Sequence, residues 1–235
     1  YGLEGDDTLT AGAGYDRLFG GAGDDTLTGG PNDTDWIWGP DGELIADFTY
    51  ADYSDSPDGI SVTLAGGPGS TDSTVADGYG GTDTLINIEG VRGSEFADTY
   101  VVADTYENHY SDTWSTFEGR GGDDVITGSG ETQIGYTEAD AGVTVDLDLG
   151  TGQSTDADDA AGVGVDTFTG VESVKGSDYD DTLTGSDAEW ESFRGGGGDG
   201  GGGYDFPVAI IDCPTYEINP PDTVLIDGTQ SYDPK

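Results

Sequence analysis

Apolar residues in this chain fall mainly at alternate positions within short runs. Residues 60–64 read Ile-Ser-Val-Thr-Leu, and residues 143–149 read Val-Thr-Val-Asp-Leu-Asp-Leu. A period of two puts every second side chain on one face, so these runs predict strands with one buried face. No stretch shows a convincing helical period with capping residues, and no apolar run approaches the roughly 18 residues of a membrane span. The pattern therefore predicts an all-β chain in which helix is scarce.

A unit of nine residues repeats along the chain. Three units stand back to back at Gly2–Thr10, Ala11–Phe19 and Gly20–Thr28, with Gly at the fourth position, Asp at the sixth and Leu at the eighth. An irregular fourth unit begins at Gly29, and single copies follow at residues 93–101, 119–127 and 176–184. Because one such unit can bury its apolar face only against its neighbours, the repeat predicts a solenoid of strands and loops.

A longer repeat overlies the short one. Residues 53–64 match residues 136–147, and residues 81–89 match residues 164–172, both at an offset of 83. We therefore divide the chain into a regular nonapeptide segment (1–38), a first long repeat (39–113), a second long repeat with a degenerate glycine-rich end (114–205) and a tail (206–235).

The composition is strongly acidic and rich in glycine. The 235 residues include 49 Asp and Glu against 6 Lys and Arg, which gives a net charge of −43, and there are 43 glycines. Only 33% of the residues are hydrophobic, which at this charge is typical of disorder, yet aromatic residues make up 10%. We therefore expect a chain that is unstable alone and folds when cations neutralise it. For the acidic residues outside the repeats, a solvated face or adaptation to high salt is the alternative.

Charge and residue usage exclude several classes of function. Nucleic acid needs basic patches, so it is excluded as a partner, and insertion into or binding to anionic membranes is not expected. The single cysteine, Cys213, allows no internal disulfide, and with His109 as the only histidine there are too few ligands for zinc. We interpret His109 as a surface residue rather than a member of a hydrolytic triad, so the chain is not expected to be an enzyme.

The nonapeptide itself points to a metal ion. Glycine permits tight turns and close approach of backbone carbonyls, and an Asp fixed in such a loop adds a hard anionic oxygen. Carbonyl and carboxylate oxygens are the ligands of Ca²⁺, which takes six to eight of them in forgiving geometry, whereas Mg²⁺ keeps its waters and suits such a loop less well. One six-residue loop cannot complete that shell, but two stacked loops can.

The pattern G-G-x-G-x-D-x-U-x in residues 2–28 resembles the RTX, or hemolysin-type, calcium-binding repeat. The resemblance implies a parallel β-roll in which each nonapeptide makes half a turn and several Ca²⁺ ions lie between loops of alternate units. It also implies secretion from a bacterium and folding outside the cell, where calcium is abundant.

Carried over by position, the resemblance implies specific ligands. Asp7 and Asp25 would flank one row of ions, and Asp16 with Asp35 (or Asp33) the other row. The same motif position is occupied by Asp98, Asp124, Asp181 and Asp205. Backbone carbonyls of the glycine-rich loops, such as those of Gly2, Gly20 and Gly119, would complete the shells.

The tail has a different character from the repeats. Residues 206–235 contain several prolines and two apolar runs, and they resemble the opening strands of a PKD-like or other immunoglobulin-like module. Two strands cannot form a sandwich alone, so either the remainder lies beyond this chain or the strands pair with a neighbouring subunit. Since the chain also opens within a repeat at Tyr1, we expect it to be a piece of a longer protein.

Repeats followed by an immunoglobulin-like start are typical of stalks. The leading interpretation is a calcium-dependent structural module of a large secreted adhesin, matrix or fibre protein. The alternatives are the secretion and folding module of an exoenzyme whose catalytic domain lies elsewhere, and a subunit of a filament assembled by strand exchange. For Trp36, Trp38, Trp114 and Trp190, packing at strand ends is favoured over stacking on surface glycans.

Overall fold

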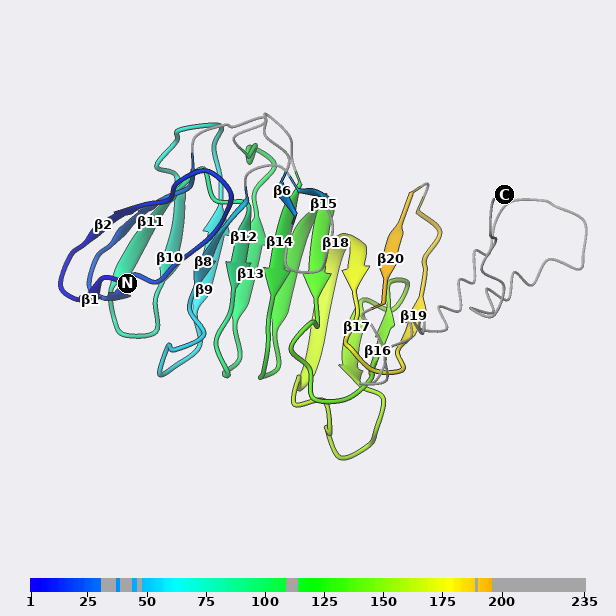
Figure 1. Ribbon diagram of the computed structural model, residues 1–235. Helices are drawn as coiled ribbons and strands as arrows, with labels where there is room; N and C mark the ends of the chain where they lie inside the picture. The colour runs from blue at the N-terminus through cyan, green and yellow to red at the C-terminus, as the bar shows by residue number, and fades with distance from the viewer. Residues whose placement is uncertain (31–36, 39–43, 46–47, 109–113, 189, 196–235) are drawn as a thin grey trace, which may run out of the picture.

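The computed structural model describes residues 1–30, 37–38, 44–45, 48–108, 114–188 and 190–195. Over these ranges the chain forms twenty strands and no helix, as predicted (Figure 1). The strands are β1 (Leu3–Glu4), β2 (Thr8–Thr10), β3 (Tyr15–Leu18), β4 (Gly21–Ala22), β5 (Thr26–Thr28), β6 (Ile37–Trp38), β7 (Leu44–Ile45), β8 (Phe48–Asp52), β9 (Ser61–Leu64), β10 (Ser73–Ala76), β11 (Thr82–Ile86), β12 (Gly90–Arg92), β13 (Thr99–Val102), β14 (Ser115–Glu118), β15 (Val125–Gly135), β16 (Val143–Asp146), β17 (Thr151–Ser154), β18 (Val165–Lys175), β19 (Thr182–Thr184) and β20 (Ser192–Arg194). A search of the same residues finds no helix with the length and apolarity that a membrane crossing needs.

Most strands stack side by side along one axis, in two rows (Figure 1). The long row runs β2, β5, β11, β10, β9, β13, β15, β18, β17, β16 and β19. The short row runs β3, β8, β12, β14, β15, β18 and β20. The 11-residue strands β15 and β18 belong to both rows, because each pairs with long-row strands through its first half and with short-row strands through its second.

The nonapeptide segment coils as the resemblance implied. β2 lies in the long row, β3 in the short row and β5 again in the long row, so each unit of nine residues makes half a turn. Leu9 pairs with Leu27 in parallel, and Leu27 pairs in turn with Leu85 of β11. The segment therefore continues directly into the sheet of the first long repeat.

The long repeats depart from a purely parallel roll. β9, β10 and β11 are joined as antiparallel neighbours, and so are β16, β17 and β18. The turn between β10 and β11 contains Gly78 and Gly80 at φ values of 76° and 107°, a region that glycine enters without a steric penalty. Such tight turns return the chain beside the strand it has just left, which only an antiparallel pair allows.

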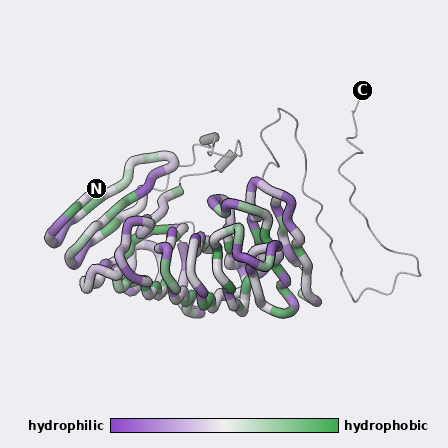
Figure 2. Tube along the Cα trace, turned by 90° about the horizontal axis from the view of Figure 1, so that it is seen from below, coloured by the Kyte–Doolittle hydropathy of each residue, from purple (hydrophilic) through white to green (hydrophobic). Residues whose placement is uncertain are grey.

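The apolar core lies between the two rows. Tyr100 of the long row stacks on Phe117 of the short row, with ring centroids 4.7 Å apart. In β9, Val62 and Leu64 are buried while Ser61 and Thr63 face solvent, which is the predicted alternation. Figure 2 shows the same alternation of apolar and polar residues along the coils. Each fully buried Val or Leu contributes about 1.5–3 kcal/mol relative to an exposed one.

The alternation predicted for residues 143–149 holds only in part. Val143 and Val145 are buried, but β16 ends at Asp146 and Leu149 is 72% exposed. The chain turns here, since the Leu149 N–H donates to Oδ1 of Asp146 and Gly150 has a φ of 66°. A hydrogen-bonded turn therefore replaces the end of the predicted strand.

Several predictions fall outside the described residues. These are the tail at 206–235 with its immunoglobulin-like strands, and Asp33, Asp35, Asp205, Trp36, His109 and Cys213. Of the tryptophans with described side chains, Trp114 packs edge-on against Phe48, with ring centroids 5.7 Å apart, as packing at strand ends predicts. Trp190 is 60% exposed.

Candidate metal sites

The aspartates at the sixth nonapeptide position form a ladder along one edge of the long row. The Asp7 N–H donates to Oδ1 of Asp25 over 2.8 Å, and the Asp25 N–H donates to Oδ1 of Asp83 over 3.0 Å. Asp7 and Asp25 immediately precede long-row strands and Asp83 is the second residue of one, so strand stacking brings the carboxylates together. The structure thus places the predicted pair Asp7 and Asp25 side by side.

A second ladder repeats this arrangement where the first long repeat meets the second. The Asp98 N–H donates to Oδ1 of Asp124 over 2.8 Å, and the Asp124 N–H donates to Oδ1 of Asp166 over 3.0 Å. Asp181 accepts instead from the N–H of Val143 at 2.9 Å. Asp16 lies apart from all of these, because it belongs to β3 in the short row.

Two ladder residues, Asp83 and Asp166, were missed by the sequence analysis. Residues 78–86 read GYGGTDTLI and residues 161–169 read AGVGVDTFT, so each Asp stands at the sixth position of a degenerate nonapeptide. The signal was the D-T-U-x ending before an apolar strand residue. It was read only as part of the longer repeat.

Glycine at the first nonapeptide position leaves room for these carboxylates. A Cβ on Gly2 would lie 2.7 Å from Oδ2 of Asp7 and closer still to the carbonyl oxygen of Gly20 in the next coil. A Cβ on Gly93 would likewise collide with Oδ2 of Asp98 and lie 2.8 Å from the carbonyl oxygen of Gly119. Carboxylate and carbonyl oxygens from adjacent coils therefore converge, which is the donor set that calcium uses.

Three of the predicted ligands carry an oxygen that the protein leaves unsatisfied. Oδ2 of Asp7, Asp16 and Asp25 is buried and has no hydrogen-bond partner, and Asp25 as a whole is 1% exposed. A buried charged oxygen without a partner is costly. A hard cation offsets that cost, so these residues fit calcium and would hold it with the neighbouring loop carbonyls.

The pKa values of the ladder carboxylates reflect their burial. Burial, followed by the charge of Asp7, raises the pKa of Asp25 above its ordinary value. Burial raises the pKa of Asp83 to about 6. Burial and mutual repulsion raise the pKa of Asp124, and burial raises that of Asp166. Each group thus favours neutralisation, by a proton or by a metal ion.

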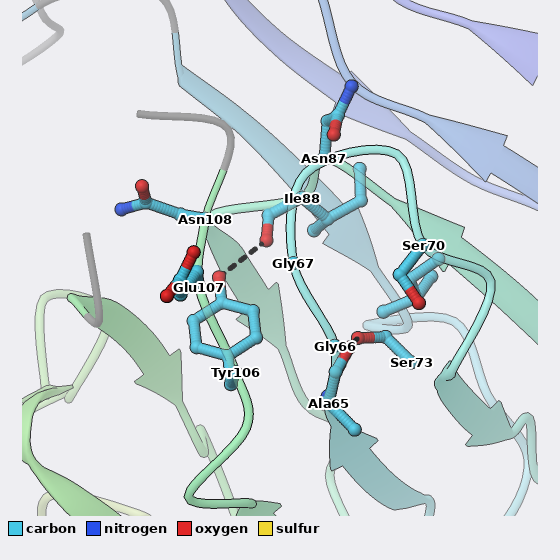
Figure 3. Close-up of a pocket in the computed structure, with 11 residues that line it drawn as sticks. Ala65, Gly66, Gly67, Ser70, Ser73, Asn87, Ile88, Tyr106, Glu107 and Asn108 are labelled. Carbon is cyan, nitrogen blue, oxygen red and sulfur yellow. Dashed lines mark hydrogen bonds between the residues drawn. The ribbon is translucent and has the colours of Figure 1, made fainter. Parts of the chain in front are cut away.

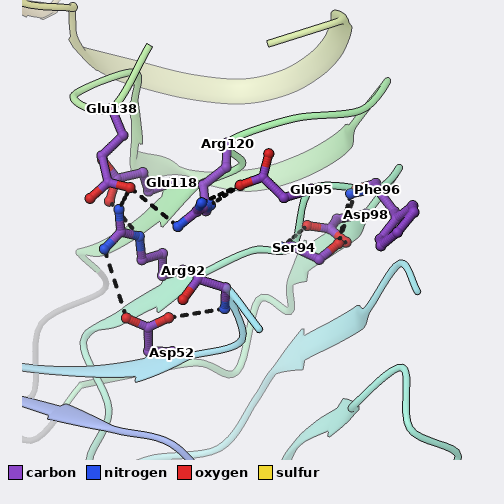
Figure 4. Close-up of polar contacts among 10 residues, drawn as sticks. Asp52, Arg92, Ser94, Glu95, Phe96, Asp98, Glu118, Arg120 and Glu138 are labelled. Carbon is purple, nitrogen blue, oxygen red and sulfur yellow. Dashed lines mark hydrogen bonds and ion pairs between the residues drawn. The ribbon is translucent and has the colours of Figure 1, made fainter. Parts of the chain in front are cut away.

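Other carboxylates at the sixth position are satisfied by the chain itself. Ser94 donates its N–H to Oδ2 of Asp98 and its hydroxyl to Oδ1, both over 2.8 Å (Figure 4). Ser177 does the same for Asp181, over 2.9 and 2.6 Å. These two predicted ligands therefore differ from Asp7 and Asp25, because both oxygens already accept hydrogen bonds from the protein.

A tyrosine hydroxyl completes the last carboxylate of each ladder. Tyr53 donates to Oδ2 of Asp83 and Tyr136 donates to Oδ2 of Asp166, each over 2.9 Å. The two contacts are related by the long repeat, as are the serine contacts. Burial and the neighbouring carboxylate raise the pKa of both tyrosines well above the ordinary value, so both stay protonated donors.

The described residues offer no comparable site in a cavity or in a cluster of metal-binding side chains. A small cavity of about 10 Å³ lies between Gly66, Asn87 and Tyr106, whose hydroxyl donates to the carbonyl of Ile88 over 3.0 Å (Figure 3). That volume holds about one water molecule. Within the described ranges no three His, Cys, Asp or Glu side chains cluster as metal ligands, so a site here has to combine carboxylates with backbone carbonyls.

Comparison with known families agrees with this geometry. The model of the RTX calcium-binding nonapeptide repeat matches residues 1–34, 114–131 and 162–189, with four copies. The matched segments include Asp7, Asp16 and Asp25, whereas Asp98 and Asp83 lie outside them. No curated protein matches the chain.

Proposed function

Because the chain carries RTX calcium-binding nonapeptide repeats, we propose that it is a calcium-dependent structural module of a large secreted bacterial adhesin, matrix or fibre protein. In this proposal it folds outside the cell when calcium binds, and it serves as a scaffold rather than as an enzyme. Its partners are calcium and neighbouring domains or subunits of the same assembly.

The observation that carries the proposal is the set of unsatisfied oxygens on Asp7, Asp16 and Asp25. Bound calcium supplies positive charge and accepts oxygen ligands from two coils at once. Without it, carboxylates stacked from coil to coil repel one another across a buried edge. A ligand that binds only the folded state stabilises it by roughly 4 kcal/mol per site at a thousandfold excess over its Kd. A few sites therefore decide whether this segment is folded.

The stacking along one axis supports a role as a stalk. Strands of the long row pair continuously from β2 near one end to β19 near the other (Figure 1). The nonapeptide segment and both long repeats share this one sheet. A rod of this kind sets the distance between the domains attached to its two ends.

Circular dichroism during a calcium titration tests the proposal. Starting in excess chelator, we expect the β signal to grow as free calcium rises to millimolar levels, with magnesium as the control ion. Asp25→Asn should shift the midpoint to higher calcium. Asp148→Asn removes the same charge from an exposed residue and should leave the midpoint unchanged. A β spectrum that is complete in chelator would contradict the proposal.

A further inference from the structure

Asp77 occupies the turn between β10 and β11 and is 0% exposed. Its Oδ1 accepts three backbone N–H groups, from Tyr79 and Gly80 at 2.9 Å and from Gly81 at 2.8 Å. These bonds use one oxygen of the carboxylate to hold the turn. The other oxygen, Oδ2, is buried and has no hydrogen-bond partner. The hydrogen bonds that hold the turn therefore explain one carboxylate oxygen of Asp77 and leave the other without a role.

Oδ2 of Asp77 faces the nonapeptide coil stacked beside it. A Cβ on Gly81 would lie 2.9 Å from this oxygen and closer still to the carbonyl oxygen of Gly23. A carboxylate oxygen of one turn and a carbonyl oxygen of the next coil thus both lie beside Gly81. The same convergence occurs at Gly2, between Asp7 and Gly20, where the nonapeptides predict a calcium site.

The surroundings of Asp77 are strongly negative. Its charge acts on both Asp25 and Asp83, and Oδ2 of Asp25 is a second buried oxygen without a partner. Asp83 is held by the N–H of Asp25 and by the hydroxyl of Tyr53. Two unsatisfied carboxylate oxygens therefore remain where the nonapeptide segment meets the first long repeat.

We propose that Asp77 is a calcium ligand, which binds an ion between the coil containing Gly23 and the β10–β11 turn. Oδ2 of Asp77 and the carbonyl oxygen of Gly23 are its ligands here, and the carboxylate of Asp25 balances the charge. The proposal rests on the calcium-dependent function above. Asp77 precedes the nonapeptide at 78–86 instead of occupying a motif position, and it lies outside the segments that match the repeat model. The ion would join the nonapeptide segment to the long repeat.

The second long repeat supplies a built-in control. The residue at the offset of 83 from Asp77 is Ala160. Its neighbour Asp159 holds the corresponding turn, but there Oδ1 accepts from the N–H of Val163 and Oδ2 from that of Gly164, both over 3.1 Å. Asp159 is exposed and both of its oxygens are used. The second ladder should therefore lack the equivalent ion.

Calcium titration calorimetry of the full chain tests the site. Asp77→Asn keeps an acceptor for the turn but replaces Oδ2 by an amide, so it should bind one ion fewer than the unchanged protein. Asp159→Asn has the same net charge and should bind the full number. Equal stoichiometry and affinity for Asp77→Asn and the unchanged protein would overturn the site and leave the proposed function standing. Failure of the unchanged protein to take up calcium would overturn both.

Terbium luminescence keeps the test decisive if Asp77→Asn does not fold. Tyr79 lies in the same turn, is 41% exposed, and donates its hydroxyl only to the carbonyl of Asp55 at the surface. A terbium ion held by Asp77 should be sensitised by this ring, so Tyr79→Phe should remove part of the tyrosine-excited emission without altering the fold. Emission unchanged by Tyr79→Phe would overturn the site.

Discussion

The nonapeptide segment and the long repeats place an aspartate at the same position and complete it in different ways. In the segment, Asp7 and Asp25 each keep one buried oxygen without a partner. In the long repeats, Ser94 satisfies both oxygens of Asp98, and Tyr136 completes Asp166. The carboxylate is constant, and the donors around it vary.

This difference predicts which of the ladder carboxylates depend on metal. Ser94 and Ser177 occupy the second position of their units, where the segment has Leu3 and Gly21. A serine there donates twice to the carboxylate, whereas glycine or leucine offers no side-chain donor. We therefore predict that a serine at the second position marks a carboxylate whose oxygens the protein satisfies by hydrogen bonding, and that a glycine or leucine there marks one that needs a cation.

The long repeats also contain ion pairs that need no metal. Arg92 is 2% exposed and pairs with Asp52 over 3.8 Å, with Glu118 over 3.5 Å and with Glu138 (Figure 4). Arg120 pairs with Glu138 over 3.2 Å and with Glu95. These contacts join β8, β12 and β14 at the edge of the short row, so several acidic residues are neutralised within the protein.

The largest expected effect is the loss of structure from the nonapeptide segment in chelator. Hydrogen exchange measured by mass spectrometry should show β2 and β5 losing protection, because Asp7 and Asp25 then repel without compensation. Strands β9 and β13 should stay protected longer, since Ser94 and the buried Val62 and Tyr100 support them without metal.

Magnesium in place of calcium is the control for that experiment and should restore little protection to β2 and β5. Loss of protection in both regions at the same chelator concentration would contradict the proposed difference between the nonapeptide segment and the long repeats. The long repeats would then depend on calcium as much as the nonapeptide segment does.

Replacing Arg92 should lower the free energy of unfolding by the next largest amount. Arg92→Met removes the buried cation between Asp52 and Glu118, so that Asp52 keeps only the ion pair with Arg17 at 3.2 Å. Removing one partner of a buried ion pair typically costs about 3–5 kcal/mol. Urea denaturation in saturating calcium measures this free energy of unfolding. Arg194→Met, at an exposed arginine of β20, is the matched control with a small expected effect. Equal stability of Arg92→Met and the unchanged protein in saturating calcium would contradict the division between the two regions.

Much of this contrast was predictable from local sequence, and some was not. The alternation at 60–64 and the nonapeptides at 2–28 predicted strands, half-turn coils and the pairing of Asp7 with Asp25, because each depends on residues close in the chain. The antiparallel turns were not predicted, because the resemblance to the calcium-binding repeat implied a parallel β-roll.

The donors that replace metal were also beyond sequence reasoning. Tyr136 reaches Asp166 across 30 residues, and its contact depends on how β15 and β18 stack. Asp77 lies outside every motif and became visible only through its buried oxygen. Contacts set by stacking leave no local pattern, which is why the tyrosine donors were missed, whereas Asp83 and Asp166 at the ladder ends carried a local signal in their degenerate nonapeptides.

Removing a tyrosine donor should have a moderate effect. Tyr136→Phe keeps the ring in the core but leaves Oδ2 of Asp166 without its hydrogen bond, and such a loss costs about 1–3 kcal/mol. Thermal denaturation in chelator measures the change. Tyr179→Phe removes a hydroxyl from an exposed ring and should fall within about 0.5 kcal/mol of the unchanged protein. Equal stability of the two variants would show that the Tyr136 hydroxyl does not stabilise the Asp166 carboxylate in the absence of metal.

The smallest expected effect is a rise in stability on mild acidification in chelator. Burial raises the pKa of Asp83 to about 6 from its ordinary value of 3.8. A raised folded-state pKa gives a contribution that is fully present below the unfolded value and is lost as pH rises through the folded value. Lowering the pH from about 7 to about 5 should therefore stabilise the metal-free protein by about 1 kcal/mol through Asp83.

Saturating calcium should reverse the sign of this pH dependence, because protons then compete with the ion for carboxylates such as Asp25. Asp83→Asn isolates the contribution of Asp83 to this pH dependence. The amide oxygen of the new side chain can still accept a hydrogen bond from the Asp25 N–H, but the side chain no longer titrates. Melting temperatures in chelator should therefore depend less on pH for this variant than for the unchanged protein. An identical pH dependence would assign the effect to the other buried carboxylates. Asp83 would then remain ionised, with its charge stabilised by the hydrogen bond from the Tyr53 hydroxyl. It would differ still more from Asp25, whose Oδ2 has no hydrogen-bond partner.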